Sequence, residues 1–356
     1  MKKYNIFINP KELKELHSND WSDERVKAVL MFSSNKYKAN LCFRGYHIRE
    51  LRKKSYDLIF TKANFLNQTR MLHLNAEYND PSLIRNKLSM DFFNSIGVLS
   101  PSAEHVLLYI NGVFQGVYLQ LESMDESSLV RRNLPKGPIF YATNNDANFS
   151  LLTAEGNPKS TLLDGYTKKY GNEDAEDSLT ELLVKINTLP NDEFFVEIQK
   201  VLHVNQYLTW LAGVVCTQNL DGFENNYALY QNSETGLFEI SPWDFDATWG
   251  RDIHGEPLEY DYVSITGENT LTARILYFPK FRQEYKEILS NILDHEFTVS
   301  RQLPKIHSLL ELIMPYLKKD PYYIKKDVHL EEEISIFTDF IQQRRSYLQA
   351  KLPTLK

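Results

Sequence analysis

Hydrophobic and polar positions in the first third of the chain follow the period-two pattern of strands. Runs rich in β-branched and aromatic residues, with turn-forming residues between them, predict strands over Arg25–Ser33, Ala39–Arg44, Ser55–Thr61 and Met71–Leu74. Two longer runs, His105–Ile110 and Val113–Glu122, flank Asn111-Gly112, a dipeptide that accepts the positive φ angles of a tight hairpin turn. The pattern therefore predicts a β-rich N-terminal part.

One prominent helix interrupts these strands. Apolar residues recur near one face over Pro81–Ser95, and Gly97 follows as a stop. Asp80 is a suitable N-cap and Pro81 a suitable first helical residue. We expect the helix to begin directly after Asp80.

After a connector rich in Asn, Ser, Pro and Gly, at about 123–171, the apolar period becomes helical. The predicted helices are Ala175–Asn187, Asp192–Leu202, Val204–Thr217, Leu271–Asp294, Ser300–Lys318 and His329–Lys351. Pro279 should break the fourth of these, and a short hairpin, Tyr227–Gln231 then Leu237–Ser241, lies among them. The sequence predicts an α+β fold with a β-rich part over 1–125 and a mainly helical part over 126–356.

Composition excludes some classes of function. The chain has 40 Lys+Arg against 47 Asp+Glu, a formal net charge of −7, which argues against a general nucleic-acid binder because such a protein needs a basic face. Cys42 and Cys216 are expected to be buried free thiols, as is usual in a reducing compartment. No apolar run resembles a signal peptide or a membrane span, so we expect a soluble protein made in a cytoplasm.

The densest polar cluster is 218–227, directly after a strongly apolar helix, and a second follows at 241–250. Because the hairpin between them reverses the chain, both clusters should meet at one end. Carboxylates and a carboxamide that converge in this way suit a hard cation such as Mg²⁺. The alternative is that these Asp and Asn residues only form turns and cap neighbouring elements.

The spacing favours a particular chemistry. Asp221 and Asn226 are five positions apart, and Asp244 follows across the hairpin. Protein kinases place a catalytic-loop Asp, an Asn on a metal ion and a second metal-binding Asp in this order. The sequence departs from an ordinary kinase at two places, because no His-Arg precedes Asp221 and no glycine follows Phe245.

A kinase also needs a cation on the phosphates. The basic cluster at 44–56 leads directly into a predicted strand. In strand alternation Lys54 shares one face with Tyr56, and Lys53 shares the other with Ser55. We favour Lys54 as the phosphate ligand, with Lys53 as its rival; the alternative is a solvated basic loop. The Gly-rich phosphate loop of conventional kinases is absent from this part of the sequence.

Five ordered motifs give the chain a specific resemblance. They are RGYHIRELRKKSY at Arg44–Tyr56, NDPSLIRNKL at Asn79–Leu88, YINGVFQGVYLQLE at Tyr109–Glu122, NLDGFENNY at Asn219–Tyr227 and PWDFD at Pro242–Asp246. With these motifs the sequence resembles the CotH kinases, a family named for a spore coat protein. The resemblance runs from about residue 25 to residue 250.

The resemblance implies an atypical protein-kinase-like fold of two lobes, the first β-rich with one main helix and the second larger and helical. It implies ATP with Mg²⁺ or Mn²⁺ as cofactors and other spore coat proteins as partners, phosphorylated on Ser or Thr. It implies location in the spore coat after synthesis in the mother-cell cytoplasm. Residue by residue, it implies Asp221 as catalytic base, Asn226 and Asp244 as metal ligands, and Lys54 on the phosphates.

Two aromatic side chains are candidates for the adenine site. Trp243 precedes the metal-binding Asp244, and Tyr141 lies in the connector between the two parts, so both rings could sandwich a purine. Plain core packing is the alternative for each. Arg85 lies in the predicted helix, which contains no Glu, and either reaches phosphate or pairs with Asp80 or Asp91.

Two other functions compete with the kinase interpretation. The first is a structural coat assembly protein with a vestigial nucleotide site, and the second is a metal-dependent phosphohydrolase. If the chain is a kinase, the carboxylates of Asp221, Glu224, Asp244 and Asp246 should favour acceptor hydroxyls in polar, basic segments.

Overall fold

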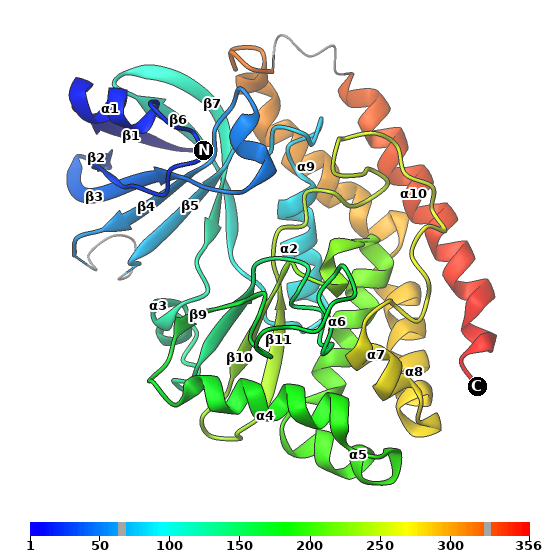
Figure 1. Cartoon of the computed structure of the whole chain (residues 1–356). Coiled ribbons are helices and arrows are strands. Elements are labelled where there is room, and N and C mark those ends of the chain that lie inside the picture. The colour runs from blue at the N-terminus through cyan, green and yellow to red at the C-terminus, as the bar shows by residue number, and fades with distance from the viewer. Residues whose placement is uncertain (63–68, 324–328) are drawn as a thin grey trace.

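A computed structural model of the chain describes residues 1–62, 69–323 and 329–356 (Figure 1). Its N-terminal part is a closed barrel with the strand order β1-β2-β3-β4-β5-β7-β6, in which β1 and β6 run parallel and close the barrel. The strands are β1 Lys2–Ile8, β2 Val26–Phe32, β3 Asn35–Phe43, β4 Tyr56–Phe60, β5 Met71–Asn75, β6 Ala103–Ile110 and β7 Val113–Glu122.

Side chains alternate along these strands, so each strand has one face inside the barrel and one outside. Leu41, Leu58 and Leu74 are fully buried in the barrel's own core. The strands β2 and β4 to β7 match the predicted ones closely, whereas β3 begins at Asn35, four residues before the predicted start. Asn111 and Gly112 turn between β6 and β7 with φ of 49° and 81°, as predicted. The strand β1 and the helix α1 (Pro10–Leu16) were not predicted.

The helix α2 (Arg85–Ser95) begins later than predicted. Asp80 is not the N-cap residue, which is Ile84; its carboxylate accepts hydrogen bonds from the backbone amides of Ser82 at 2.8 Å and of Arg85, the first residue of α2, at 2.9 Å. Leu83 has a φ of 58°, which interrupts helical backbone. Figure 1 shows α2 between the barrel and the helical part of the molecule.

The rest of the chain is mainly helical around a four-stranded sheet of order β11-β10-β8-β9, so the chain is α+β as predicted. The sheet contains β8 Ile139–Ala142, β9 Tyr166–Tyr170, β10 Tyr227–Gln231 and β11 Phe238–Pro242. The helices are α3 Glu126–Arg131, α4 Ala175–Thr188, α5 Asn191–Glu197, α6 Val204–Thr217, α7 Thr270–Leu276, α8 Pro279–His295, α9 Val299–Leu317 and α10 Leu330–Lys351.

Two features of this part bear on the predictions. The break at Pro279 is confirmed, because α7 ends at Leu276 and α8 begins at Pro279. The connector is not an irregular segment as its composition indicated, since it supplies α3, β8 and β9.

Cys42 and Cys216 are buried and free, as predicted. Among the described residues no helix has both the length and the apolarity to cross a membrane.

Candidate active site

The hairpin of β10 and β11 brings the two polar clusters to one end. Tyr227 pairs with Pro242 at that end, and the amide of Trp243 donates to the carbonyl of Asn226 at 2.9 Å. Asn226 and Asp244 leave the hairpin with left-handed backbone, each with a φ of 56°. The predicted convergence of these two residues is therefore a property of the strand register.

Asp221 reaches the same end from α6. The helix stops at Thr217, Gln218 turns the chain with a φ of 61°, and Asp221 opens a short 3₁₀ turn over Asp221–Phe223. The pKa of Asp221 is raised, first by burial and then by the charge of Asp244. The structure thus places the predicted base within electrostatic reach of the predicted metal ligand.

Buried carboxyl groups gather around Asp244. The pKa of Asp244 is raised by burial, and that of Asp246 is raised to about 8 by burial and by Asp244 and Asp80. Glu77, from the segment between β5 and α2, has a pKa far above its ordinary value because it is buried and faces Asp246 and Asp244. Its Oε1 accepts from Asn86 Nδ2 at 3.1 Å, but its buried Oε2 has no partner among the described residues.

This arrangement fits a divalent cation. The described part of the chain contains no group of three or more His, Cys, Asp or Glu side chains placed to hold a metal ion. Mg²⁺ does not need such a group, since it takes one or two protein carboxylates together with phosphate and water oxygens. A cation beside Asn226 and Asp244 would offset the mutual repulsion of Asp244, Asp246 and Glu77.

Asn86 of α2 links Glu77, which follows β5, to Phe245, the residue after Asp244. Its amide nitrogen holds Glu77, and its Oδ1 accepts from the backbone amide of Phe245 at 3.3 Å. The Phe245 ring meets Phe93 edge-to-face at 4.9 Å. Phe93 in turn approaches Gly213 of α6 so closely that a Cβ there would lie 2.4 Å from its ring. The residue after Asp244 is therefore fixed by α2 and α6.

Both candidate lysines are bonded to carboxylates other than Asp221 and Asp244, although the charge of Glu77 also acts on Lys53. Lys54 Nζ bonds to Asp20 Oδ2 at 2.5 Å and also donates to the carbonyl of Arg49. Lys53 is 2% exposed, and its Nζ donates to the carbonyl of Val117 at 2.6 Å and to Asp320 Oδ2 at 3.2 Å. The role of Lys54 on the phosphates stays a prediction.

The two rings of the predicted aromatic sandwich, Tyr141 and Trp243, lie against each other in this structure. Their ring centroids are 4.7 Å apart and their planes are inclined by 49°. A purine between two rings needs about 7 Å, twice the contact distance of roughly 3.5 Å. The hydroxyl of Tyr141 also accepts from the amide of Met124 at 2.7 Å, which holds the ring in place. The binding of adenine by Tyr141 and Trp243 stays a prediction.

A polar patch on the outside of the barrel faces the same pair. We call Arg44, Asp57, His73 and Asn75 the barrel patch. Asp57 lies opposite His73 in the register of β4 and β5, and its Oδ1 contacts His73 Nδ1 at 2.6 Å and Arg44 Nε at 3.1 Å. Arg44 also donates to Asn75. Burial opposes ionisation of Asp57, but the charges of His73 and Arg44 lower its pKa to about 2.

The barrel patch touches Trp243 directly. The guanidinium carbon of Arg44 lies 5.6 Å from the centroid of the Trp243 ring, and the His73 ring meets it edge-to-face at 5.2 Å. Arg44 and His73 are also the charges that counteract the raised pKa of Asp244. Arg44, directly after β3, therefore supplies positive charge to the predicted metal ligand, while burial lowers the pKa of His73 in β5 and favours its neutral imidazole.

Comparison with known proteins agrees with this geometry. The family described as CotH kinase protein matches residues 41–348, which include all five motifs. The chain belongs to the CotH kinase family. It is 47% identical over 353 residues to inner spore coat protein H of Bacillus subtilis (strain 168), covering 99% of this chain and 98% of that protein.

Two further matches are more distant. The inner spore coat protein H-like protein of the same organism is 31% identical over 310 residues, 85% of this chain and 87% of that protein. Among solved structures, the Helicobacter pylori proinflammatory kinase CtkA aligns over 98% of this chain and 96% of its own, with 9% identity and a TM-score of 0.38.

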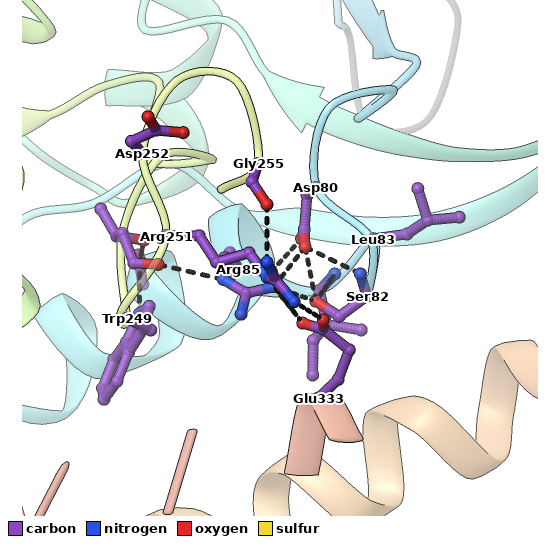
Figure 2. Close-up of polar contacts among 12 residues, drawn as sticks. Asp80, Ser82, Leu83, Arg85, Trp249, Arg251, Asp252, Gly255 and Glu333 are labelled. Carbon is purple, nitrogen blue, oxygen red and sulfur yellow. Dashed lines mark hydrogen bonds and ion pairs between the residues drawn. The ribbon is translucent and has the colours of Figure 1, made fainter. Parts of the chain in front are cut away.

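In this chain Arg85 is held by buried ion pairs. It is fully buried, and Figure 2 shows its guanidinium between Asp80 and Glu333 of α10. Nη1 lies 2.5 Å from Asp80 Oδ1 and 2.9 Å from Glu333 Oε2, and Nε donates to the carbonyl of Thr248 at 3.0 Å. Of the alternatives considered from sequence, pairing with Asp80 is confirmed, whereas Asp91 binds Lys87 instead.

Glu77, Asp57 and His73 were missed by the sequence analysis. Asp57 and His73 lie opposite each other once the register of β4 and β5 is known, and a paired acid and imidazole on one strand face would have marked them. No comparable pattern points to Glu77, which is a single acidic residue in an irregular segment. Its position beside Asp244 and Asp246 depends on the tertiary fold alone.

Proposed function

We propose that this chain is an atypical two-lobed protein kinase of the spore coat, which transfers the γ-phosphate of ATP to Ser or Thr hydroxyls of other coat proteins. The barrel is the first lobe in this proposal and the helical part the second. The carrying observation is the placement of Asp221, Asn226 and Asp244 at one end of the β10–β11 hairpin. Membership of the CotH kinase family and a relative named as a spore coat protein support it.

Each side chain has a distinct role in the proposed reaction. Asp221 accepts the proton of the attacking hydroxyl, and its raised pKa makes its carboxylate a better proton acceptor than an ordinary Asp. Asn226 and Asp244 hold Mg²⁺ or Mn²⁺. The bound metal supplies charge neutralisation for the phosphates. Phe245 keeps Asp244 in place through its contacts with Asn86 and Phe93.

The acceptor segments are proposed to be basic. Glu224 follows the catalytic turn, and its pKa is raised by burial and by the nearby charges of Asp221 and Glu268. Glu268 thus extends the acidic rim that the sequence predicted around Asp221. Such a rim attracts extended chains rich in Lys and Arg and repels acidic ones.

The proposal is tested by incubating the purified protein with γ-labelled ATP, Mg²⁺ and a spore coat extract. Asp221→Asn keeps the shape of the side chain and removes the base, so labelling should fall by about 10²–10⁴-fold. The control is Asp339→Asn, a change at an exposed position in the middle of α10, which should label at the wild-type rate. Equal labelling by Asp221→Asn and wild type would refute the assignment.

One observation favours the alternative, a coat assembly protein with a vestigial nucleotide site. Lys53 and Lys54 are both bonded to side-chain carboxylates other than Asp244. Under that alternative the protein binds no ATP, and spores carrying Asp221→Asn assemble a normal coat. ATP binding by the wild type, together with a defective coat in that mutant, would exclude it.

A further inference from the structure

We propose that a groove along α7 binds an aliphatic or aromatic side chain of the acceptor segment, about four to six residues from the phosphorylated Ser or Thr. The inference rests on the proposed function, because it adds a second feature of the substrate to its basic charge. It makes the protein select segments that carry both a Lys or Arg near the acceptor hydroxyl and an apolar residue further along the chain.

The groove lies between α7 and the loop before it, and its volume is about 530 Å³. Protein sites for small organic groups usually have volumes of about 300–1,000 Å³. Among the described residues that line the groove, Glu268 is the only charged one. The groove is therefore large enough for one or two side chains and is mostly uncharged.

The groove begins at the catalytic turn. Asn269, in its lining, donates from Nδ2 to the carbonyl of Phe223 at 3.1 Å. Gly267 has a φ of 67°, and a Cβ there would lie 2.7 Å from the Phe223 ring, so glycine lets the loop pack this closely. Phe223 belongs to the same 3₁₀ turn as Asp221. A chain whose hydroxyl is held at Asp221 therefore reaches the groove within a few residues.

The helix that forms one wall is fixed at both ends. Asn269 Oδ1 accepts from the backbone amide of Thr272 at 2.8 Å and so caps α7. The hydroxyls of Thr272 and of Tyr207 in α6 share a hydrogen bond at 2.6 Å. Arg282 of α8 donates to the carbonyl of Tyr277 at 2.7 Å. A wall held in this way needs little reordering when a peptide binds, which favours affinity.

Three apolar residues share one face of α7. Ala273, Leu276 and Tyr277 line the groove at positions i, i+3 and i+4, which lie together on a helix surface. Ala273 is exposed, Tyr277 is 60% exposed, and the Tyr277 ring lies edge-to-face against Phe278 at 5.3 Å. Single exposed apolar residues are common, but an apolar strip that lines a groove is typical of a contact surface.

The length of the groove sets the spacing in the substrate. Tyr277 is eight positions after Asn269, about 12 Å along a helix that rises 1.5 Å per residue. An extended peptide covers this distance in about four residues of 3.3 Å each. Since the acceptor hydroxyl lies before the groove, at Asp221, the apolar residue follows at about four to six positions.

Charge at the near end of the groove fits the same occupant. Glu268 lies in the lining, and its charge acts on Glu224, as does that of Asp221. These carboxylates attract Lys or Arg beside the acceptor and repel acidic chains. The basic and the apolar residue of the substrate therefore meet different parts of one continuous surface.

The test is a double-mutant cycle on the full-length protein with Lys/Arg-flanked serine peptides. Two peptides differ only at one position, five residues from the acceptor, which is Leu in one and Ser in the other; a second pair has this position on the opposite side of the acceptor. Tyr277→Ser should raise the KM of one Leu peptide by about 3–10-fold, as expected for a lost apolar contact, with little change in kcat. The KM of the matching Ser peptide should differ by less than about twofold between the two proteins.

Two further variants control this comparison. Ala273→Gln fills the groove from an exposed position with a good helix former and should act like Tyr277→Ser. Val113→Ser removes an apolar side chain that is 62% exposed on the barrel, and it should leave both KM values at the wild-type level. Thermal unfolding checks that all variants are folded.

The outcomes separate this inference from the proposed function. If the wild type phosphorylates no serine peptide, the proposed function fails, and the role of the groove in substrate choice fails with it. If the wild type phosphorylates Leu and Ser peptides with equal KM, or Tyr277→Ser affects both alike, only the groove assignment is overturned. A lower oligomeric state of Tyr277→Ser in sedimentation would also overturn it and assign the groove to contact between two copies of this chain.

Discussion

Lys53 and Asp320 form an ion pair at 3.2 Å between side chains that are 2% and 0% exposed. Asp320 follows α9 and also accepts from the backbone amides of Val117 at 2.9 Å and Tyr322 at 2.9 Å. Gly116 makes this approach possible, because a Cβ there would lie 2.0 Å from Asp320 Oδ2. The segment after α9 is therefore anchored to the barrel by a desolvated charge pair.

Removal of one partner of this pair should be strongly destabilising. Asp320→Ala leaves the Lys53 ammonium buried without its carboxylate and should cost about 3–5 kcal/mol in the free energy of unfolding. Glu126→Ala, which breaks an ion pair between exposed side chains with Lys136, should cost less than about 1 kcal/mol. Urea unfolding of both variants measures the difference. Similar values for the two would show that the buried pair is energetically neutral.

Asp244 should make the binding of ATP depend on the metal ion. Because Asp244 stands beside Asn226 at the hairpin end, Asp244→Ala removes the carboxylate predicted to hold the metal. We expect weaker binding of Mg²⁺–ATP, while binding of metal-free adenosine stays the same. Calorimetry with and without EDTA measures both. If Mg²⁺–ATP binds the mutant as tightly as the wild type, Asp244 is not a metal ligand.

Stability should depend on pH through Asp246. Its pKa is raised from 3.8 to about 8, so the folded state keeps a proton that the unfolded chain releases. This contribution to stability is fully present below the unfolded pKa and is lost as pH rises through the folded one. Without divalent cations, the free energy of unfolding should fall between about pH 4 and pH 8, by at most roughly 1.4 kcal/mol per unit for one proton.

Two comparisons check this pH dependence. Asp246→Asn cannot ionise and should flatten the slope, as measured by thermal unfolding at several pH values in EDTA. Added Mg²⁺ should stabilise the wild type more at high pH, because the cation competes with protons for the same carboxyl groups. An unchanged slope in Asp246→Asn would assign the titration to another group.

Substrate choice should depend on the acidic rim. Glu268→Gln removes one of the two charges that act on Glu224, so the preference for Lys/Arg-flanked over Glu-flanked serine peptides should decrease several-fold. The wild-type preference should also weaken in high salt. Phosphorylation rates over a peptide panel at two ionic strengths measure both effects. A preference that ignores salt would place substrate recognition outside the rim.

The local elements of this fold were accessible from sequence, and the long-range partners were not. The helix Val204–Thr217 and the Asn111-Gly112 turn depend on residues close in the chain, and both were predicted as found. The position of the Lys53 ammonium group depends on its bond to Asp320, and no periodicity in the sequence connects these two residues. Asp80 is of a residue type that favours the N-cap position, but its carboxylate pairs with the Arg85 guanidinium and closes a turn.

The candidate site also contains residues whose proximity could be predicted from the sequence and others for which it could not. Asp221, Asn226 and Asp244 lie within one contiguous stretch, so their spacing and a hairpin were enough to predict that they meet. The polar groups that face Asp244 from the barrel, Arg44 and His73, meet at Asp57, and the register of β4 and β5 had to be known to predict that. Alternation assigned Lys54 to a strand face, but β4 begins only at Tyr56, and the pattern could not show that the Lys54 ammonium group bonds to Asp20.

The parallel pairing of β1 with β6 has a consequence for the growing chain on the ribosome. Lys2 pairs with Val106 and Ile6 with Ile110, so β1 has no partner on that side until about 110 residues have been made. At about 5–20 residues per second, this edge stays open for roughly 5–20 s. During that time the nascent β1 and β2 expose an unpaired strand edge, a template for pairing with another chain. Crowded polysomes are therefore where this protein is most exposed to misassembly.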